Sequence, residues 1–267
     1  MIAGRGTIAR VNVPASIEQH NREIHANAKS WKRKPVLQRV YREFYRLIAA
    51  ELNRSLDGPT LELGSGIGAI KEHIPNCITS DLFPNPWLDR VENAYQLSFG
   101  AAALANIVLF DVWHHLRYPG LALDEFARVL QPGGRLIVFD PAMGLLGRVV
   151  YGAFHKEPLG FDQTPSWFPA PDADDRDTYY AAQGNCWRMF QRREFPLPSA
   201  RWRVAAVRLH SALSYVASGG FSGPQLYPSF GYRPIRAAEW LADRFPSLFA
   251  TRMLVVLEVA DAPPQPR

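Results

Sequence analysis

Three glycines at alternate positions, Gly64, Gly66 and Gly68, constrain this chain more than any other feature. They follow the apolar run Thr60–Leu63, which contains one acid, and they lead into the segment Ala69–His73. Because glycine lacks a Cβ, its backbone can adopt positive φ in a tight turn and let a ligand lie directly against it. A helix at Ala69–His73 would point unpaired N–H groups and the positive end of its dipole at that ligand. The pattern predicts a strand, a glycine turn and a helix that together hold a ligand of the adenosine type.

The glycine spacing fits two kinds of nucleotide-binding turn. The dinucleotide pattern G-x-G-x-x-G/A is met loosely by Gly64, Gly66 and Ala69. The spacing E/D-x-G-x-G-x-G is met residue by residue by Glu62, Gly64, Gly66 and Gly68. On these residues the sequence resembles the class I S-adenosylmethionine-dependent methyltransferases, in particular their small-molecule "type 11" branch.

Four further segments follow in the order of that family, so the resemblance covers residues 58–143. They are a strand ending in a carboxylate, a turn, a buried strand followed by D-V-x-H-H-L, and a helix end with a Pro-Gly-Gly turn and a strand: Ile78–Phe83, Val91–Leu97, Asn106–Leu116 and Ala127–Asp140. In the last segment the helix should stop at Gln131, because Pro132 disfavours helical backbone at the residue before it. In the family, Asp81 would accept the ribose hydroxyls, which a carboxylate could equally do for NAD, and Asn93 stands where aspartate is usual. The cofactor contacts that the resemblance implies are Glu62, Gly64, Ser65, Gly66, Gly68, Asp81, Leu82, Asn93, Ala94 and Asp111.

Alternating strand and helix patterns predict an α/β fold with a parallel sheet and right-handed crossovers. The resemblance implies a Rossmann-like, doubly wound, seven-stranded and mostly parallel sheet with an antiparallel last strand at Met253–Val259. We expect the following divisions: an N-terminal segment with lid helices (1–56), the cofactor-binding core (57–143), a cap insertion that contacts substrate (144–203), the end of the sheet domain (204–261) and an unstructured tail (262–267).

The N-terminal part carries helix signals, with Pro35 as a break. After it, six apolar residues fall on one helical face and should pack against the sheet. They are Leu37, Val40, Tyr41, Phe44, Ile48 and Leu52. The stretch Ala28–Lys34 before the break could cover the cofactor as a lid.

The insertion of roughly 60 residues between the fifth and sixth strands is far longer than a plain connection. It leaves the edge of the sheet where ligands bind in open α/β sheets, so it is well placed to build a substrate pocket. An ordinary packed cap is the alternative. Its second half interleaves arginines with aromatic residues, which fits a core with a charged rim, a site for an anionic substrate or, least well, a nucleic-acid surface. The residues are Arg188, Arg192, Arg193, Arg201, Arg203, Trp187, Phe190, Phe195 and Trp202.

Three histidines are candidate catalytic bases, because histidine titrates near neutral pH. His114 and His115 follow the fourth predicted strand, and His155 opens the insertion. Each could instead be structural. A base is needed only for a hydroxyl acceptor, because methyl transfer from a sulfonium depends mainly on alignment.

We expect no metal site. The acids in the segment Asp172–Asp177 lack the spacing of a calcium loop. The metal-dependent catechol-type methyltransferases carry further acids after the fourth-strand aspartate, whereas Trp113, His114 and His115 follow Asp111 here.

Taken together, the sequence predicts an S-adenosylmethionine-dependent methyltransferase whose acceptor is a hydroxyl or carboxyl group of a small amphipathic, lipid-linked or anionic molecule. Two alternatives stay open: a nicotinamide-dependent oxidoreductase and a catalytically silent cofactor-binding homologue. The formal charge of +5 comes without a nucleic-acid-binding motif, so we expect no nucleic-acid partner. No stretch approaches the ~18 apolar residues of a membrane span, and the start lacks an apolar signal region, so we expect a cytoplasmic protein.

Overall fold

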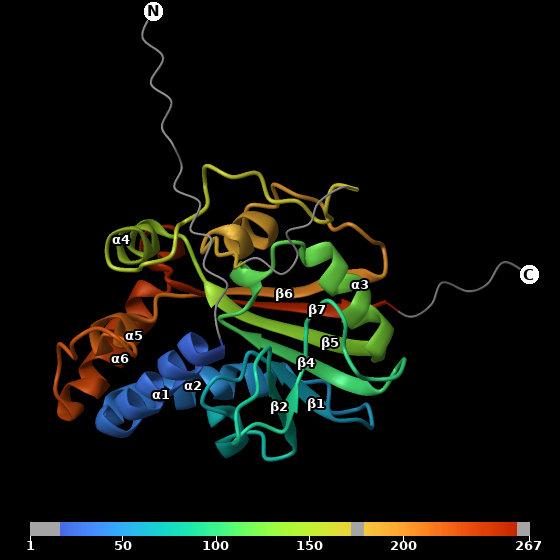
Figure 1. Ribbon diagram of the computed structural model, residues 1–267. Helices are drawn as coiled ribbons and strands as arrows, with labels where there is room; N and C mark the ends of the chain where they lie inside the picture. Colours follow the sequence, from blue (N-terminus) through green and yellow to red (C-terminus); the bar gives the residue numbers. More distant parts are fainter. Residues whose placement is uncertain (1–16, 172–178, 261–267) are drawn as a thin grey trace, which may run out of the picture.

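The computed structural model describes residues 17–171 and 179–260, and Figure 1 shows a twisted sheet with helices on both of its faces. Residues 1–16, the acidic segment Asp172–Asp177 and the predicted tail at 262–267 lie outside the described residues. The strands are β1 (Thr60–Leu63), β2 (Cys77–Asp81), β3 (Arg90–Val91), β4 (Leu104–Phe110), β5 (Leu130–Pro141), β6 (Trp202–His210) and β7 (Arg252–Val259).

The seven strands lie in the order β3-β2-β1-β4-β5-β7-β6. β1 to β5 pair in parallel, and β7 runs antiparallel to both of its neighbours, β5 and β6. All seven residues of β4 are buried, as expected of a central parallel strand covered on both faces. The predicted fold class is therefore confirmed, including the antiparallel last strand.

Helices cover the two faces of the sheet. They are α1 (Ile17–Arg33), α2 (Pro35–Ala50), α3 (Pro119–Val129), α4 (Leu145–Ala153), α5 (Leu213–Ser218), α6 (Tyr232–Ala242) and α7 (Pro246–Phe249). On one face, Phe44 of α2 shares a buried apolar cluster with Val108 of β4. On the other face, Phe126 of α3 shares a second cluster with Leu109, the next residue of the same strand. The break at Pro35 and the buried face of α2 were both predicted correctly.

The helix predicted after the glycine turn was wrong in length. A single 3₁₀ turn, η1 (Ala69–Glu72), stands in its place. Pro75 disfavours helical backbone at Ile74, and β2 begins only two residues later, so no room remains for a longer helix. An extended helix dipole therefore does not act on the turn.

The end of α3 also differs from the prediction. The helix stops at Val129, two residues before the predicted end at Gln131, and Leu130 already pairs with Leu104 of β4. The register between β4 and β5 then shifts, because residues 131–134 form an irregularity before pairing resumes at Arg135.

The insertion is partly core and partly surface. Cys186, Met189 and Phe190, in and next to the π-helical turn η3 (Trp187–Gln191), are buried in the second apolar cluster. Leu145 and Val149 of α4, by contrast, expose half or more of their side chains. Throughout the described ranges, no helix has the length and apolar content needed to cross a membrane.

Candidate cofactor and catalytic site

The predicted glycine turn lies at the carboxyl end of β1. Gly64, Gly66 and Gly68 all have positive φ, at 71°, 52° and 70°. A Cβ added at Gly64 would lie 2.4 Å from Cγ2 of Val112, so a side chain does not fit there. Ile24 of α1 lies nearest to Gly66, with its Cδ1 3.5 Å from the position of an added Cβ. The turn is therefore covered by α1 at Ile24, ahead of the predicted lid stretch Ala28–Lys34.

Asp81, at the carboxyl end of β2, is tied to the glycine turn. Its Oδ2 accepts a hydrogen bond from the Gly66 N–H at 3.2 Å, and its Oδ1 accepts one from the Leu82 N–H at 2.8 Å. Trp87 adds a further contact, because its indole N–H donates to the Gly66 carbonyl at 2.9 Å. The structure thus brings the predicted turn and the predicted ribose acid together.

The predicted adenine residues lie around a surface hollow. A cavity of about 400 Å³ is lined by Leu82 and Asn93, together with residues of the segment 91–98. Leu82 is 52% exposed, as an open hydrophobic wall would be. The Asn93 Oδ1 accepts a hydrogen bond from the Tyr95 N–H at 2.9 Å and so also stabilises the local turn. Ala94 is half-buried next to it.

Glu62 carries a buried carboxylate with one oxygen unpaired. The residue is 1% exposed, and among the described residues its Oε2 has no hydrogen-bond partner. Burial disfavours the charged form and, with Asp81 nearby, raises the pKa of Glu62 to about 8. Ser65 lies in the turn and donates its hydroxyl to the Glu62 carbonyl at 3.3 Å. A buried unpaired acid beside a glycine turn is a ready partner for a cationic group.

Asp111, which follows β4, has a left-handed backbone with φ of 56°. Its carboxylate forms an ion pair with Arg252, which is 1% exposed and lies at the start of β7. The guanidinium also lies 4.4 Å from the ring centre of Tyr215. The Asp111 side chain thus pairs with a buried arginine. The backbone of Asp111 is therefore the part that remains for the predicted cofactor contact.

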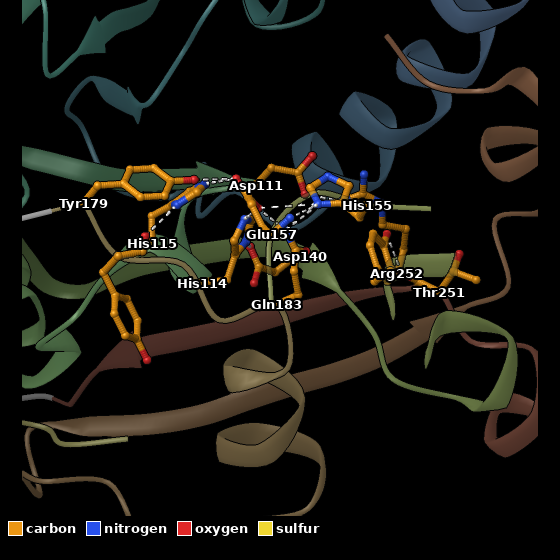
Figure 2. A network of polar contacts seen from close by, with 12 residues as sticks. Asp111, His114, His115, Asp140, His155, Glu157, Tyr179, Gln183, Thr251 and Arg252 are labelled. Atoms are coloured by element: carbon orange, nitrogen blue, oxygen red, sulfur yellow. Dashed lines mark hydrogen bonds and ion pairs between the residues drawn. The ribbon is translucent and has the colours of Figure 1, made fainter. Parts of the chain in front are cut away.

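The three predicted catalytic histidines gather around one carboxylate, that of Glu157 (Figure 2). His114 Nε2 and His115 Nε2 lie 3.4 and 3.7 Å from its oxygens, and His155 Nδ1 lies 3.7 Å away. Asp140, buried at the end of β5, contacts His114 Nδ1 at 2.9 Å. The structure therefore brings the three predicted histidines together and adds two acids to them, while their catalytic role stays a prediction.

Burial and neighbouring charges shift the pKa values of the three histidines in different directions. Burial alone would lower the pKa of His114, but the carboxylates of Asp140 and Glu157 outweigh it and raise that pKa to about 10. Burial and the charge on His114 lower the pKa of His115 to about 4. Burial also lowers the pKa of His155, whose side chain is 43% exposed.

Comparison with known proteins identifies a family domain in this chain. Residues 61–138 match the family model described as a methyltransferase domain. This match shows a methyltransferase domain at residues 61–138 and covers less than a third of the chain. The resemblance stated from the motifs is thereby confirmed, and the matched residues include the turn, Asp81, Asn93 and Asp111. No curated protein matches the sequence.

Several solved methyltransferase structures are distantly similar to the chain. One is geranyl diphosphate C-methyltransferase from Streptomyces coelicolor A3(2), in complex with Mg²⁺, geranyl diphosphate and S-adenosylhomocysteine. It is 12% identical to this chain, and the alignment covers 97% of this chain and 89% of that one, with a TM-score of 0.45. A methyltransferase from Thermotoga maritima, a possible histamine N-methyltransferase, is 13% identical over 90% and 99% of the two chains, with a TM-score of 0.48. The family assignment rests on residues 61–138 and not on these structures.

Four residues near the histidines escaped the sequence analysis: Asp140, Glu157, Gln183 and Arg252. Asp140 and Arg252 carried a usable signal, since Asp140 lies near the carboxyl end of one apolar strand and Arg252 at the start of another. Glu157 follows His155 by two residues and could have been considered with it. Gln183 has no local signal, because only the path of the insertion brings it to the site.

The aromatic residues in the second half of the insertion are part of the core, and arginines around them form ion pairs with glutamates. Trp187, Phe190 and Trp202 are buried. Arg188 pairs with Glu194, and Arg203 pairs with Glu258. These contacts account for that part of the pattern without a nucleic acid.

Proposed function

We propose that the protein is an S-adenosylmethionine-dependent methyltransferase that transfers a methyl group to a hydroxyl or carboxyl group of a small molecule. The observation that carries the proposal is the glycine turn itself: three left-handed glycines at the end of β1, with Asp81 tied to Gly66, inside a methyltransferase domain. The same turn and the hollow at Leu82 and Asn93 offer room for the nucleoside. The solved relatives that contain S-adenosylhomocysteine or sinefungin are consistent with this cofactor.

The residues of the turn fit the cofactor chemically. Gly64 and Gly66 would allow the methionine portion to lie against the backbone, and Asp81 would accept the ribose hydroxyls. The unpaired oxygen of Glu62 would receive the ammonium group, which removes the cost of an unpaired buried acceptor. When bound, S-adenosylmethionine supplies the methyl group on a positively charged sulfur.

The chain's own contribution to the chemistry is alignment and proton removal. Alignment of two reactants can supply roughly 7–11 kcal/mol. As the acceptor oxygen forms its new bond to the methyl carbon, the bond from that carbon to sulfur breaks and the hydroxyl proton must leave. His155 is the most exposed of the three histidines, since 43% of its side chain is exposed, against 33% for His115 and 3% for His114. Glu157 lies beside His155 and would stabilise it after protonation.

An amphipathic or anionic acceptor, including a lipid-linked one, fits the surface around the insertion. A cavity of about 330 Å³ is lined by apolar residues, among them Leu145 and Trp187, and by Arg148 and Arg192. Phe154, the neighbour of His155, is 82% exposed. An apolar wall with Arg148 and with Arg192, which also pairs with Glu194 at 2.8 Å, suits a molecule with a hydrocarbon part and an acidic group. Both cysteines are buried free thiols, which suits the cytoplasm.

Methyl transfer can be tested directly. Purified protein is incubated with methyl-labelled S-adenosylmethionine and the small-molecule and lipid fractions of a cell extract. We expect label in one of these fractions, and no label with the Gly64→Ala variant. Label confined to protein or nucleic acid, or none in any fraction although S-adenosylhomocysteine binds, would contradict the proposed activity and favour a different acceptor or a silent homologue.

A further inference from the structure

Three side chains from two separate segments converge beside the proposed methyl-transfer site. His114 and His115 lie in the short turn η2 (Trp113–His115) after β4, and Glu157 comes from the insertion (Figure 2). One ligand atom from each lies within 4.8 Å of the others. The Glu157 oxygens are 3.4 Å from His114 Nε2 and 3.7 Å from His115 Nε2. Ligand atoms bound tetrahedrally at ~2.0–2.2 Å lie about 3.4 Å apart, so the spacing suits one metal ion.

The two imidazoles are held with Nε2 facing Glu157. His114 Nδ1 lies 2.9 Å from Asp140 Oδ1, and His115 Nδ1 lies 3.0 Å from the Tyr180 carbonyl oxygen. A carbonyl oxygen can only accept, so His115 carries its hydrogen on Nδ1 and keeps a lone pair on Nε2. Carboxylate and carbonyl partners on the second nitrogen are the usual support of metal-binding histidines.

The negative charge of the cluster favours a bound cation, and a buried amide lies beside Glu157. The carboxylates of Asp140 and Glu157 both face His114 in a largely buried cluster, and a divalent cation in place of the His114 proton would balance their two negative charges. Gln183 is 2% exposed and contacts Glu157, and among the described residues its Oε1 has no hydrogen-bond partner. Its Nε2 lies 3.5 Å from His155 Nδ1, so the NH₂ end of this amide faces the cluster.

We propose that His114, His115 and Glu157 bind one divalent transition-metal ion such as Zn²⁺. Two imidazoles and one carboxylate suit Zn²⁺ and its neighbours in the first transition row, and they suit Mg²⁺ or Ca²⁺ poorly. Three protein ligands leave a fourth position open, as in catalytic zinc sites. The role of the ion rests on the proposed function: it would bind the acceptor oxygen and make loss of its proton to His155 easier. Its binding does not depend on that function.

This site would overturn the expectation of a metal-free protein. That expectation considered the acids of the segment Asp172–Asp177 and the residues directly after Asp111, whereas the carboxylate ligand here is Glu157.

The test measures metal binding in the absence of S-adenosylmethionine. Full-length protein is stripped with a chelator, mixed with excess Zn²⁺, desalted and assayed for metal content. We expect about one equivalent of zinc in the wild type and at least a tenfold loss in His115→Ala and Glu157→Gln. The control His73→Ala removes a histidine outside the cluster and should keep one equivalent. Circular dichroism confirms that each variant is folded.

Cobalt provides a second readout, because the visible absorption of bound Co²⁺ reports its ligands. A spectrum in the wild type that disappears in Glu157→Gln supports the site, even if His115→Ala fails to fold. Zinc content below a tenth of an equivalent in the wild type, or an unchanged equivalent in Glu157→Gln, would overturn the proposal. Adenosylhomocysteine binding by the stripped protein is measured in parallel, so a failure of the metal site is distinguished from a failure of the proposed function.

Discussion

Backbone conformation at the glycine turn is the residue-scale feature on which the cofactor site depends. A left-handed backbone costs residues with a Cβ roughly 1–2 kcal/mol. Gly64 adds a steric reason, because Val112 fills the space that a Cβ would need. The position therefore combines a conformational and a packing requirement that only glycine meets.

We expect Gly64→Ala to lower the free energy of unfolding by about 2–4 kcal/mol and to abolish binding of adenosylhomocysteine. Urea unfolding and calorimetric titration measure the two effects. Gly100→Ala is the matched control, since nothing lies within 4 Å of its added Cβ, and it should change stability by less than about 0.5 kcal/mol. Equal behaviour of the two variants would show that the turn is not under this constraint.

Glu62 makes stability depend on pH in a defined direction. Because burial raises the pKa of Glu62 from 4.5 to about 8, the folded protein keeps a proton that the unfolded chain releases. This contribution is complete below about pH 4.5 and is lost as the pH rises towards 8. Between pH 5.5 and 7.5, the wild type should lose up to about 1.4 kcal/mol per pH unit relative to Glu62→Gln. Parallel unfolding curves for the two proteins would contradict the assignment.

His155 is expected to act on turnover and not on cofactor affinity. His155→Ala should lower kcat by a factor of about 10²–10⁴, the usual range for a general base, while the Kd for adenosylhomocysteine stays within about twofold. Steady-state kinetics and calorimetry give both numbers. Unchanged turnover would remove His155 from the mechanism.

The residues of the turn could be predicted because their spacing is local. The same holds for Asp81 and the histidines, which follow recognisable strands. Glu157, Asp140 and Gln183 could not be placed together from the sequence, since their proximity depends on the path of the insertion over the edge of the sheet.

At the scale of elements, one lysine joins the N-terminal helices to the C-terminal part. Lys34, between α1 and α2, donates from Nζ to the carbonyl of Gly220 at 2.7 Å and to that of Gly223 at 2.5 Å. Trp31 packs near Phe221 in the same loop, with ring centres 6.3 Å apart. The predicted lid stretch is thus fastened to the loop after α5.

We expect Lys34→Met to lower the free energy of unfolding by about 1–3 kcal/mol, because two charge-assisted hydrogen bonds are lost. Lys32→Met, at an exposed site in the last turn of α1, should change it by less than about 0.5 kcal/mol. Urea unfolding of both variants provides the comparison. A Lys34 effect no larger than the Lys32 effect would contradict the role of the junction.

Strands and long amphipathic helices were predictable because their periodicity is strong. The two errors, the length of η1 and the end of α3, both fall beside prolines. At each place the helix ends early because residues soon after it already pair with a neighbouring strand.

At the scale of the whole molecule, the ion pair of Asp111 and Arg252 links β4 to β7 beside the site. Arg252 is enclosed by aromatic rings and is 1% exposed, and Asp111 is the carboxylate with which it forms its ion pair. Neither residue could be paired from the sequence, because they lie at opposite ends of the sheet domain in the chain.

Asp111→Asn should therefore lower the free energy of unfolding by about 3 kcal/mol, the lower end of the cost of breaking a buried pair. Glu43→Gln, which breaks an exposed pair with Arg46, is the control and should cost less than about 1 kcal/mol. Thermal and urea unfolding both report this difference. Similar losses in the two variants would show that Arg252 is stabilised by other means.

The central claim is that the turn from Glu62 to Gly68 binds a sulfonium nucleoside. The most direct measurement is calorimetric titration of the purified protein with S-adenosylmethionine, S-adenosylhomocysteine and NAD. We predict saturable one-to-one binding of the first two and none of NAD. Binding of NAD without binding of either sulfur nucleoside would contradict the claim.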